Sequence, residues 1–506
     1  MLSRVFSIGV RGIDGYPVLV ELDLANGLPN FTTVGLPDSA VREARERVTS
    51  AVRNSGYKFP ARRITVNLAP AQARKQGTQF DLPIALAVLS ASGQVRADEG
   101  WSKRYCFIGE LALDGRLRSV SGALAMATKA KEEGFEALVV PHENADEVSA
   151  SGMTAYSAGS LAEVVGFING GELRSVSGAR SSAPIARRSA EDLGDVKGQI
   201  MAKRALEVSA AGGHNLLLIG PPGAGKSMLA RRLTTLLPPL TDGEALEATR
   251  VHSARGRRGL VTERPFRAPH HTASAASLIG GGPACLPGEA ALAHAGVLFL
   301  DELAEFPRPA LEALRQPLED HRVVVSRAKD TLEYPARFML VGASNPCPCG
   351  WRGADGHDCR CSGPEVRRYL AQLSGPLLDR IDIHVEMAAL SFGTWAAPKA
   401  AADTSAVVRA RVEKAREAQR RRFGRDDFAV NAYLPAAELG RWCPLDAGCL
   451  MVLERASGGG FSARALDRCV RVARTIADLA GREAIEAHHM SEAASLRGLE
   501  RLNRLC

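Results

Sequence analysis

The sequence predicts an α/β protein of several domains with a helical C-terminal part. The chain has 506 residues, of which 45% are hydrophobic, so its length and composition suit about three domains with packed cores. Residues 1–168 alternate strand-like runs such as Ile64–Leu68 with helix-like runs such as Leu82–Ser92, which is typical of an α/β domain. Near residue 220 an apolar strand, a glycine-rich loop and a helix-compatible stretch follow one another, and this order predicts a second α/β unit.

Changes in composition predict the domain boundaries. Residues 170–190 are rich in Gly, Ser and Arg and lack apolar periodicity, so we expect a linker over 169–190. Residues further along the chain carry mostly helical patterns from 403 onward. The predicted parts are a first domain at 1–168, the linker, an α/β core at 191–390 and a helical domain at 391–506.

The glycine-rich loop predicts a nucleoside triphosphate site. Residues 220–227 read GPPGAGKS and follow the apolar run Leu216–Ile219. Glycines let such a loop turn with positive φ and direct its N–H groups at phosphate oxygens, and the next helix directs its positive dipole end at the same anion. Lys226 can reach the β- and γ-phosphates, and Ser227 can offer its hydroxyl to Mg²⁺. The expected nucleotide-binding residues are Gly220, Pro221, Pro222, Gly223, Ala224, Gly225, Lys226 and Ser227, with positive φ expected at Gly220, Gly223 and Gly225.

An acidic strand end predicts hydrolysis of the bound nucleotide. Residues 297–302 read VLFLDE, as in a buried parallel strand that ends in two carboxylates. Asp301 is placed to hold Mg²⁺ through water, and Glu302 is the natural base for the attacking water. A strand that merely ends in solvated acids is the alternative, and the P-loop upstream argues against it.

The charge distribution is compatible with a nucleic-acid partner. The net charge is +8, and eight arginines and lysines fall between Arg409 and Arg425, with a second basic set at Arg250, Arg255, Arg257 and Arg258. Such local excess suits a polyanion, although solvated surface charge explains many basic proteins. The start of the chain lacks a signal-peptide apolar core, and no apolar run approaches 18 residues. We therefore expect a cytosolic protein without a membrane partner.

Four clustered cysteines predict a structural zinc site. Cys347, Cys349, Cys359 and Cys361 form the pattern CPCG–x₈–CRC. Disulfides are disfavoured in the cytosol, whereas paired thiolates on a short loop suit tetrahedral Zn²⁺, and four protein ligands leave no open position for a substrate. The alternatives are inert thiols, or His357 in place of one cysteine.

Further motifs complete a resemblance to a known family. The strand-like run Phe338–Ala343 is followed by Asn345, residues 377–383 read LLDRIDI, and a helix begins with Ser-Ala-Arg at 462–464. Together with the P-loop and VLFLDE, these motifs resemble the AAA+ ATPases, in the same order. More narrowly, the chain resembles the ComM/YifB family of magnesium-chelatase-like proteins, which are bacterial branch-migration helicases. Stretches of this kind span nearly the whole chain, among them GLPDSAVREARERV, FDLPIALAVL, FRAPHHTAS, EALRQPLEDH and SNPCPCG.

The resemblance implies roles for single residues. Asn345 matches sensor 1, Arg464 matches the sensor 2 arginine, and Arg380 matches the arginine finger that reaches the γ-phosphate of a neighbouring subunit. An arginine finger implies that ATP hydrolysis needs a ring, and the expected ring is a hexamer. Outside this motif context, Arg380 would be interpreted as a structural ion-pair residue.

Two insertions are implied as well. Residues 322–334 alternate like a β-hairpin whose tip carries Arg327 and Lys329, and related rings use such a hairpin to contact the DNA backbone in the pore; a solvated tip is the alternative. Residues 250–282 match the helix-2 insert of the same group, which also enters the pore. For His270 and His271, within that insert, we expect structural roles.

The first domain resembles the Lon-protease-like fold without its catalytic residues. Gln79 occupies the serine position in the loop KQGTQFD, and Leu124 and Met126 stand where the later segment carries lysines. Neither nucleophile nor base is present, so no acyl-enzyme chemistry is expected. The resemblance implies a non-proteolytic domain that binds DNA and helps to assemble rings.

The function that follows from the resemblance is that of an ATP-driven DNA translocase. It would drive branch migration during homologous recombination and serve DNA integration in natural transformation, with ATP, Mg²⁺ and Zn²⁺ as cofactors and branched DNA and a recombinase as partners. The alternative is a magnesium-chelatase-type ATPase subunit that remodels a protein partner, because it shares every ATP-site residue. A third class, an ATP-dependent protease, is opposed by Gln79.

Overall fold

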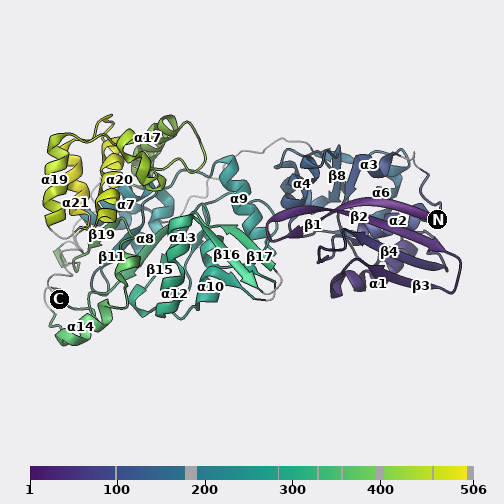
Figure 1. The fold of residues 1–506 in the computed structure, drawn as a ribbon, viewed down its shortest axis with the longest axis horizontal. Helices are drawn as coiled ribbons and strands as arrows, with labels where there is room; N and C mark the ends of the chain where they lie inside the picture. The colour runs from purple at the N-terminus through teal and green to yellow at the C-terminus, as the bar shows by residue number, and fades with distance from the viewer. Residues whose placement is uncertain are drawn as a thin grey trace. The chain divides into compact units, whose positions relative to one another are not determined.

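The computed structural model of the chain divides into two compact units (Figure 1). One unit holds Met1–Ala183 and Leu246–Val261, and the other holds Pro184–Ala245 and Thr262–Cys506. The structure describes residues 1–96, 100–176, 191–282, 284–327, 330–354, 357–390, 392–393, 404–458 and 461–497. Within these ranges, every helix is too short or too polar to span a lipid bilayer.

The first unit is built on a mixed eight-stranded sheet. Its strand order is β10-β9-β8-β5-β1-β2-β4-β3, and the long strands β1 and β2 form an antiparallel hairpin that Figure 1 shows in purple. Alternate residues of β2, such as Val18, Val20 and Leu22, are fully buried, because successive side chains of a strand point to opposite faces. The strands are β1 (Leu2–Arg11), β2 (Asp14–Ala25), β3 (Asn30–Val34), β4 (Arg63–Ala69), β5 (Tyr105–Phe107), β8 (Ala137–Pro141), β9 (Ala155–Ala158) and β10 (Arg174–Val176), and the main helices are α1 (Ser39–Asn54), α2 (Asp81–Ala91), α4 (Ala123–Glu132) and α6 (Leu161–Ile168).

The first unit extends beyond the expected boundary at residue 168. Strand β10 lies within the stretch expected to be a linker, yet it pairs antiparallel with β9. Residues Leu246–Val261, which include most of α9 (Asp242–Ser253), also belong to this unit. The Arg250 guanidinium donates to Asp14 Oδ1 at 2.6 Å, and the Gly122 amide donates to Ser253 Oγ at 2.7 Å. The first part of the expected helix-2 insert is therefore held by the first unit's own residues.

The residues at the positions of the Lon-type catalytic groups are used for packing and for local hydrogen bonds. Gln79 Nε2 donates to the Gln76 carbonyl at 2.7 Å, and Thr78 Oγ1 donates to Glu110 Oε2 at 2.6 Å. Leu124 and Met126 are buried on α4. Burial raises the pKa of Asp81 to about 6, against the opposing effect of its ion pair with Arg47. The polar side chains at these positions therefore make structural hydrogen bonds and ion pairs within the domain.

The core of the second unit is a five-stranded parallel sheet with strand order β12-β15-β18-β11-β19. The strand order reverses between β11 and β18, and in open parallel sheets ligands bind beyond the carboxyl ends of the strands at such a point. β11, β15 and β18 are buried along their whole length, as expected for strands covered on both faces. The strands are β11 (Leu216–Ile219), β12 (Phe266–Arg267), β15 (Val297–Leu300), β18 (Met339–Ser344) and β19 (Ile383–Glu386), flanked by α7 (Ile200–Gly212), α8 (Lys226–Leu236), α12 (Arg308–Ala313) and α13 (Arg315–Asp320).

The predicted hairpin before the sensor 1 strand is confirmed. β16 (Arg322–Arg327) and β17 (Asp330–Pro335) pair antiparallel, with Arg322 opposite Pro335. Lys329 lies outside the described residues, and of Arg327 the structure describes the backbone, which pairs with Asp330. Arg327 is the last residue of β16, and Lys329 lies between the two strands in sequence. Their contact with DNA remains a prediction.

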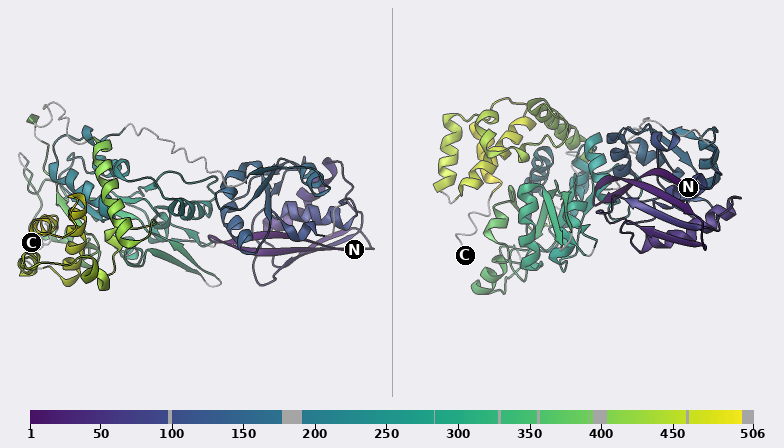
Figure 2. Two further views of the ribbon diagram at one scale, coloured as in Figure 1. Left: turned by 90° about the horizontal axis from the view of Figure 1, so that it is seen from above. Right: turned by 45° about the vertical axis from the view of Figure 1, so that its right-hand side comes forward.

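The C-terminal part is helical, as predicted. Figures 1 and 2 show these helices, coloured yellow and yellow-green, grouped together. Ser462 caps α20 by accepting from the Ala465 amide. The helices are α17 (Ser405–Phe423), α18 (Leu439–Trp442), α19 (Ala447–Gly458), α20 (Ala463–Leu479) and α21 (Ala487–Ser495).

The basic run 409–425 forms most of α17, and its arginines bind the protein itself. Five of its eight basic residues contact oxygens of the protein itself, so much of the charge of this run is used within the fold, and its suitability for nucleic acid stays a prediction. The arginines use carbonyl or carboxylate oxygens of α7, α8, α17 and α20: Arg409 binds the Thr235 carbonyl, Arg411 binds Glu207, Arg416 binds the Ala210 carbonyl, Arg421 pairs with Glu417 and Arg422 pairs with Asp478. The long guanidinium side chains fix α17 to its neighbours.

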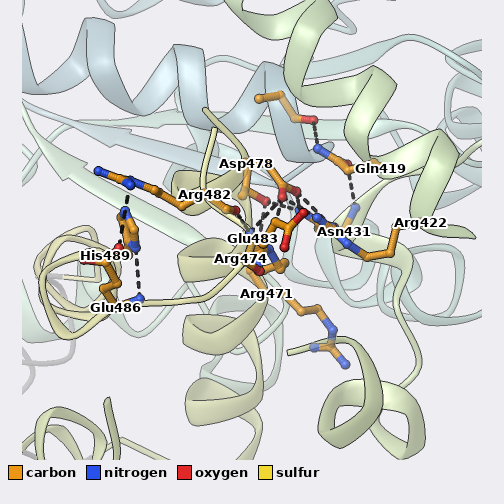
Figure 3. Close-up of polar contacts among 12 residues, drawn as sticks. Gln419, Arg422, Asn431, Arg471, Arg474, Asp478, Arg482, Glu483, Glu486 and His489 are labelled. Atoms are coloured by element: carbon orange, nitrogen blue, oxygen red, sulfur yellow. Dashed lines mark hydrogen bonds and ion pairs between the residues drawn. The ribbon is translucent and has the colours of Figure 1, made fainter. Parts of the chain in front are cut away.

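A buried polar cluster holds the helical domain together (Figure 3). Asp478 accepts from Arg422 Nη1 at 3.0 Å, from Asn431 Nδ2 at 2.9 Å and from Arg474 Nε at 3.1 Å. The side chains of Asp478 and Arg474 are each only 1% exposed. The cluster continues through Thr475, whose Oγ1 lies 2.7 Å from His214 Nε2 at the start of the core sheet.

Replacing Asp478 with alanine is expected to destabilise the helical domain by about 3–5 kcal/mol, because it leaves buried guanidinium groups without their carboxylate. Calorimetry of the full chain would show the domain's thermal transition at a lower temperature. Asp467→Ala on the same helix is the matched control, with an expected effect within about 0.5 kcal/mol. Equal shifts for the two variants would contradict this role of the cluster.

Candidate nucleotide-binding site and cysteine cluster

The P-loop connects β11 to α8 as the sequence predicts. Gly223 and Gly225 have φ values of 77° and 91°, in the region that favours glycine. Gly220 has no positive φ, which corrects the expectation for this residue. It is constrained by space instead, since a Cβ atom there would lie 2.6 Å from the Met387 carbonyl oxygen. The loop therefore uses its glycines for two different reasons.

The structure brings the predicted phosphate-site residues together at the carboxyl ends of three strands. Lys226 Nζ donates to the Gly220 carbonyl at 2.6 Å, to the Pro221 carbonyl at 3.0 Å and to Asn345 Oδ1 at 2.9 Å. Ser227 Oγ donates to Asp301 Oδ2 at 2.6 Å. Burial lowers the pKa of Lys226, and Asp301 and Glu302 oppose this shift. A cation, a hydroxyl, a carboxylate and an amide thus converge where β11, β15 and β18 end.

Glu302 adopts an unusual backbone conformation next to a histidine. Its φ is 53°, in the left-handed region that non-glycine residues seldom adopt and that costs on the order of 1–3 kcal/mol. Its amide donates to Asp301 Oδ1 at 3.0 Å, and its Oε2 lies 3.0 Å from His271 Nδ1. Strained residues of this kind cluster at active sites.

His271, for which the sequence predicted a structural role, lies beside Glu302 at the end of the acidic strand. It follows β12, which lies beside β15 in the parallel sheet, so the segments after the two strands emerge at the same edge. A histidine bonded to a carboxylate base can fix the orientation of that base, as the third member of a catalytic group does. The only signal in the sequence was the position of His270 and His271 a few residues after the strand β12. That signal predicts a contact with Glu302 only when β12 and β15 are known to be neighbours.

The two arginines implied by the family resemblance share one carboxylate. Arg380 Nη2 pairs with Glu319 Oε1 on α13, and Arg464 Nη1 lies 3.9 Å from the same oxygen. Arg380 is 5% exposed, while the Arg464 side chain is 66% exposed. The hydrogen bond from Arg380 lowers the pKa of Glu319. Both arginines therefore contact Glu319, whereas Lys226 contacts the P-loop carbonyls and Asn345.

Asn215 joins the sensor 1 strand to the arginine segment. Its Oδ1 accepts from the Leu340 amide at 2.8 Å, and its Nδ2 donates to the Arg380 carbonyl at 3.0 Å. Its own amide donates to Asp382 Oδ2 at 2.8 Å. Burial alone would raise the pKa of Asp382, but Arg468 and His214 hold it well below its usual range. This residue also escaped the sequence analysis, because nothing local marks it.

The four cysteines meet in one cluster. Their sulfur atoms all lie within 4.8 Å of one another, with Cys347–Cys349 at 3.4 Å and Cys347–Cys359 and Cys349–Cys359 at 3.7 Å. A disulfide would need about 2.05 Å, whereas the edge of a tetrahedron with Zn–S bonds of 2.3 Å is about 3.8 Å. The His357 ring stacks on Trp351 with centroids 3.9 Å apart. The donor set and its spacing fit a tetrahedral metal ion held by thiolates.

Comparisons with known proteins match the chain along its length. Family models match residues 192–394 (magnesium chelatase, subunit ChlI), 20–144 (subunit ChlI of Mg-chelatase) and 402–497 (magnesium chelatase, subunit ChlI C-terminal). The competence protein ComM of Haemophilus influenzae is 46% identical, covering 99% of this chain and 98% of its own length. YifB of Escherichia coli is 44% identical with the same coverage. The magnesium-chelatase 38 kDa subunit of Cereibacter sphaeroides is 29% identical, covering 30% of this chain and 51% of its own.

Proposed function

Because the chain belongs to the ComM/YifB family of magnesium-chelatase-like AAA+ proteins, we propose that it is an ATP-driven DNA translocase that drives branch migration during homologous recombination. The observation that carries the ATPase part is the convergence of Lys226, Ser227, Asp301 and Asn345 at the ends of neighbouring parallel strands. A similarity that covers nearly the whole of both chains favours this role over that of the chelatase subunit, with which 30% of the chain aligns.

In this proposal the site residues act on the phosphates, on Mg²⁺ or on the attacking water. Lys226 exchanges its bonds to the loop carbonyls and Asn345 for bonds to the phosphates. Ser227 and Asp301 would hold Mg²⁺, Asp301 through water, and the ion would supply positive charge to the phosphates. Glu302 accepts a proton from the attacking water, His271 orients the Glu302 carboxylate, and Asn345 positions the same water.

Hydrolysis in this proposal takes place between subunits of a ring, which we take to be a hexamer. Arg380 and Arg464 both contact Glu319; this supports the proposal that they serve one nucleotide, and the arginine-finger assignment makes it the neighbour's. Glu319 holds Arg380 until that nucleotide competes for the guanidinium.

The DNA contact is assigned to the β16–β17 hairpin, and the first domain is assigned a non-proteolytic role in binding DNA and assembling the ring. The non-proteolytic part is supported by the local hydrogen bonds of Gln79 and Thr78 and by the burial of Leu124 and Met126. Protease activity that is lost on mutating Thr78 or Ser121 would contradict it. In a naturally competent cell, branch migration would integrate incoming DNA that a recombinase has paired, in keeping with the name of the Haemophilus relative.

The double variant Arg327→Ala/Lys329→Ala is expected to retain basal ATPase activity and to lose most DNA-coupled strand exchange. Each lost phosphate contact also lowers the slope of log affinity against log salt by about 1. The exposed pair Arg367 and Arg368 on α14 (Gly363–Leu370) provides a control that removes the same charge elsewhere. Unchanged strand exchange in the hairpin variant would remove the hairpin from the mechanism.

The deciding experiment is ATP-dependent strand exchange on a labelled four-way or three-strand DNA junction, with Lys226→Ala as the control. Exchange by the wild type only would support the proposal. DNA binding without ATP-dependent exchange would contradict the translocase role, leave the ATPase assignment intact and favour a motor that remodels a protein partner, as the chelatase-type alternative requires.

A further inference from the structure

The turn that carries the first two cysteines begins directly at the nucleotide site. β18 ends at Ser344, Asn345 accepts from Lys226 Nζ at 2.9 Å, and Cys347 follows two residues later. The Gly350 amide donates to the Cys347 carbonyl at 2.9 Å and closes the turn. The cysteine cluster is therefore continuous with the sensor 1 residue along the backbone.

The same turn packs against the P-loop. A Cβ atom added at Gly350 would lie 2.7 Å from Pro222 Cδ, 2.8 Å from Pro222 Cγ and 3.7 Å from Asn345 Cγ. These separations leave no room for a side chain, and the φ of 82° at Gly350 also favours glycine. The turn thus occupies the space between a P-loop proline and the sensor 1 asparagine.

The second pair of cysteines anchors this turn to a helix. The Cys349 amide donates to Cys361 Sγ at 3.4 Å. Ser362, the next residue, caps α14 by accepting from the Glu365 amide. Four thiolates this close together repel one another unless a cation binds them, and a bound metal fixes the geometry of the loop that carries them.

We propose that the metal-loaded cluster of Cys347, Cys349, Cys359 and Cys361 is a positioning element of the ATP site. It holds the Gly350 turn between Pro222 and Asn345 and so sets the place of Asn345 relative to the P-loop. Hydrolysis therefore depends on the metal more strongly than nucleotide binding does. The inference rests on the proposed ATPase activity, and it is independent of the proposed action on DNA.

Three variants of the full chain test this coupling. Cys359→Ser removes a metal ligand, and Gly350→Ala breaks the packing on Pro222 while leaving all four thiols in place. Gly353→Ala is the matched control, because Gly353 lies in the same loop with a similar φ of 73°, and among the described residues other than its chain neighbours none has an atom within 4 Å of the position of an added Cβ. Zinc content is measured with a colorimetric chelator, binding with a fluorescent ATP analogue, and turnover without DNA.

The expected result is a loss of turnover without a matching loss of binding. Cys359→Ser should lose zinc, and Gly350→Ala should keep one zinc per chain; both should lower kcat by about 10- to 100-fold, since a misplacement of 1 Å can cost about 10²-fold. The Kd for the ATP analogue should change less than threefold. Gly353→Ala should match the wild type in all three measurements.

Hydrogen exchange supplies a readout that does not need activity. Removing zinc from the wild type should speed exchange of the P-loop amides at 223–227, while exchange in the first domain stays unchanged. Wild-type kcat in zinc-free Cys359→Ser or in Gly350→Ala would overturn the inference, as would unchanged P-loop exchange. A wild type that lacks ATPase activity yet shows the exchange effect would instead refute the proposed function and leave the coupling standing.

Discussion

Glu302→Gln is expected to lower kcat for ATP hydrolysis by about 10²–10⁴-fold, the usual contribution of a positioned general base. Glutamine keeps the shape of the side chain and can still bond to His271, which lies 3.0 Å from Glu302 Oε2, but it cannot accept a proton from water. Binding should persist, because Lys226 and Ser227 are untouched. The variant should therefore trap ATP, as measured by retention of a radiolabelled nucleotide.

Two matched variants sharpen this test. Glu305→Gln changes an exposed carboxylate three residues away and should hydrolyse ATP like the wild type. Lys226→Ala should lose nucleotide binding itself, so it separates a defect in binding from a defect in chemistry. Equal hydrolysis by the wild type and Glu302→Gln would overturn the assignment of Glu302 as the base.

Arg380→Ala is expected to lower kcat by about 10³–10⁵-fold, the range that arginine fingers contribute. Because the guanidinium would act on a neighbour's nucleotide, the defect should be rescued by mixing. Lys226→Ala subunits lack a working site of their own but supply Arg380, whereas Arg380→Ala subunits supply a working site without the finger. Mixed rings should hydrolyse ATP although neither variant does so alone.

Arg315→Ala is the control for this experiment, because it removes a guanidinium from α13, the helix that carries Glu319. It should leave kcat within about threefold of the wild type, since among the described residues its guanidinium pairs with the carboxylate of Glu312 and such surface pairs contribute little. If mixing Lys226→Ala with Arg380→Ala restores no activity, Arg380 does not act across a subunit boundary. A melting temperature of Arg380→Ala close to that of the wild type would show that the buried partner of Glu319 is dispensable for folding.

Local sequence patterns were sufficient for the elements of the second unit. The P-loop, the acidic strand and the hairpin each combine a hydrophobic period with turn or charged residues at fixed positions, so a short window contains the whole signal. The helical C-terminal domain was likewise predictable from its periodicity and from the cap at Ser462. Strand order then brings Lys226, Asp301 and Asn345 together at one edge.

Contacts between distant segments were not predictable in this way. Nothing near His271 reveals that the segment after β12 meets the end of β15, and nothing near Gly350 reveals Pro222 beside it. The basic run of α17 carries the composition of a nucleic-acid surface, yet its guanidinium groups bind oxygens of neighbouring helices. Composition reports how much charge a segment has, and only the packing shows where that charge is used.

Helix α20 has the proportions of a lever. Asp478 near its end is fixed in the buried polar cluster, and Arg464 stands in its first turn. Fourteen residues separate them, which is about 21 Å along a helix axis at 1.5 Å per residue. A tilt of about 10° around the fixed end would then displace Arg464 by nearly 4 Å, more than the length of a hydrogen bond. A tilt of that size would be enough to break the 3.9 Å approach of Arg464 to Glu319.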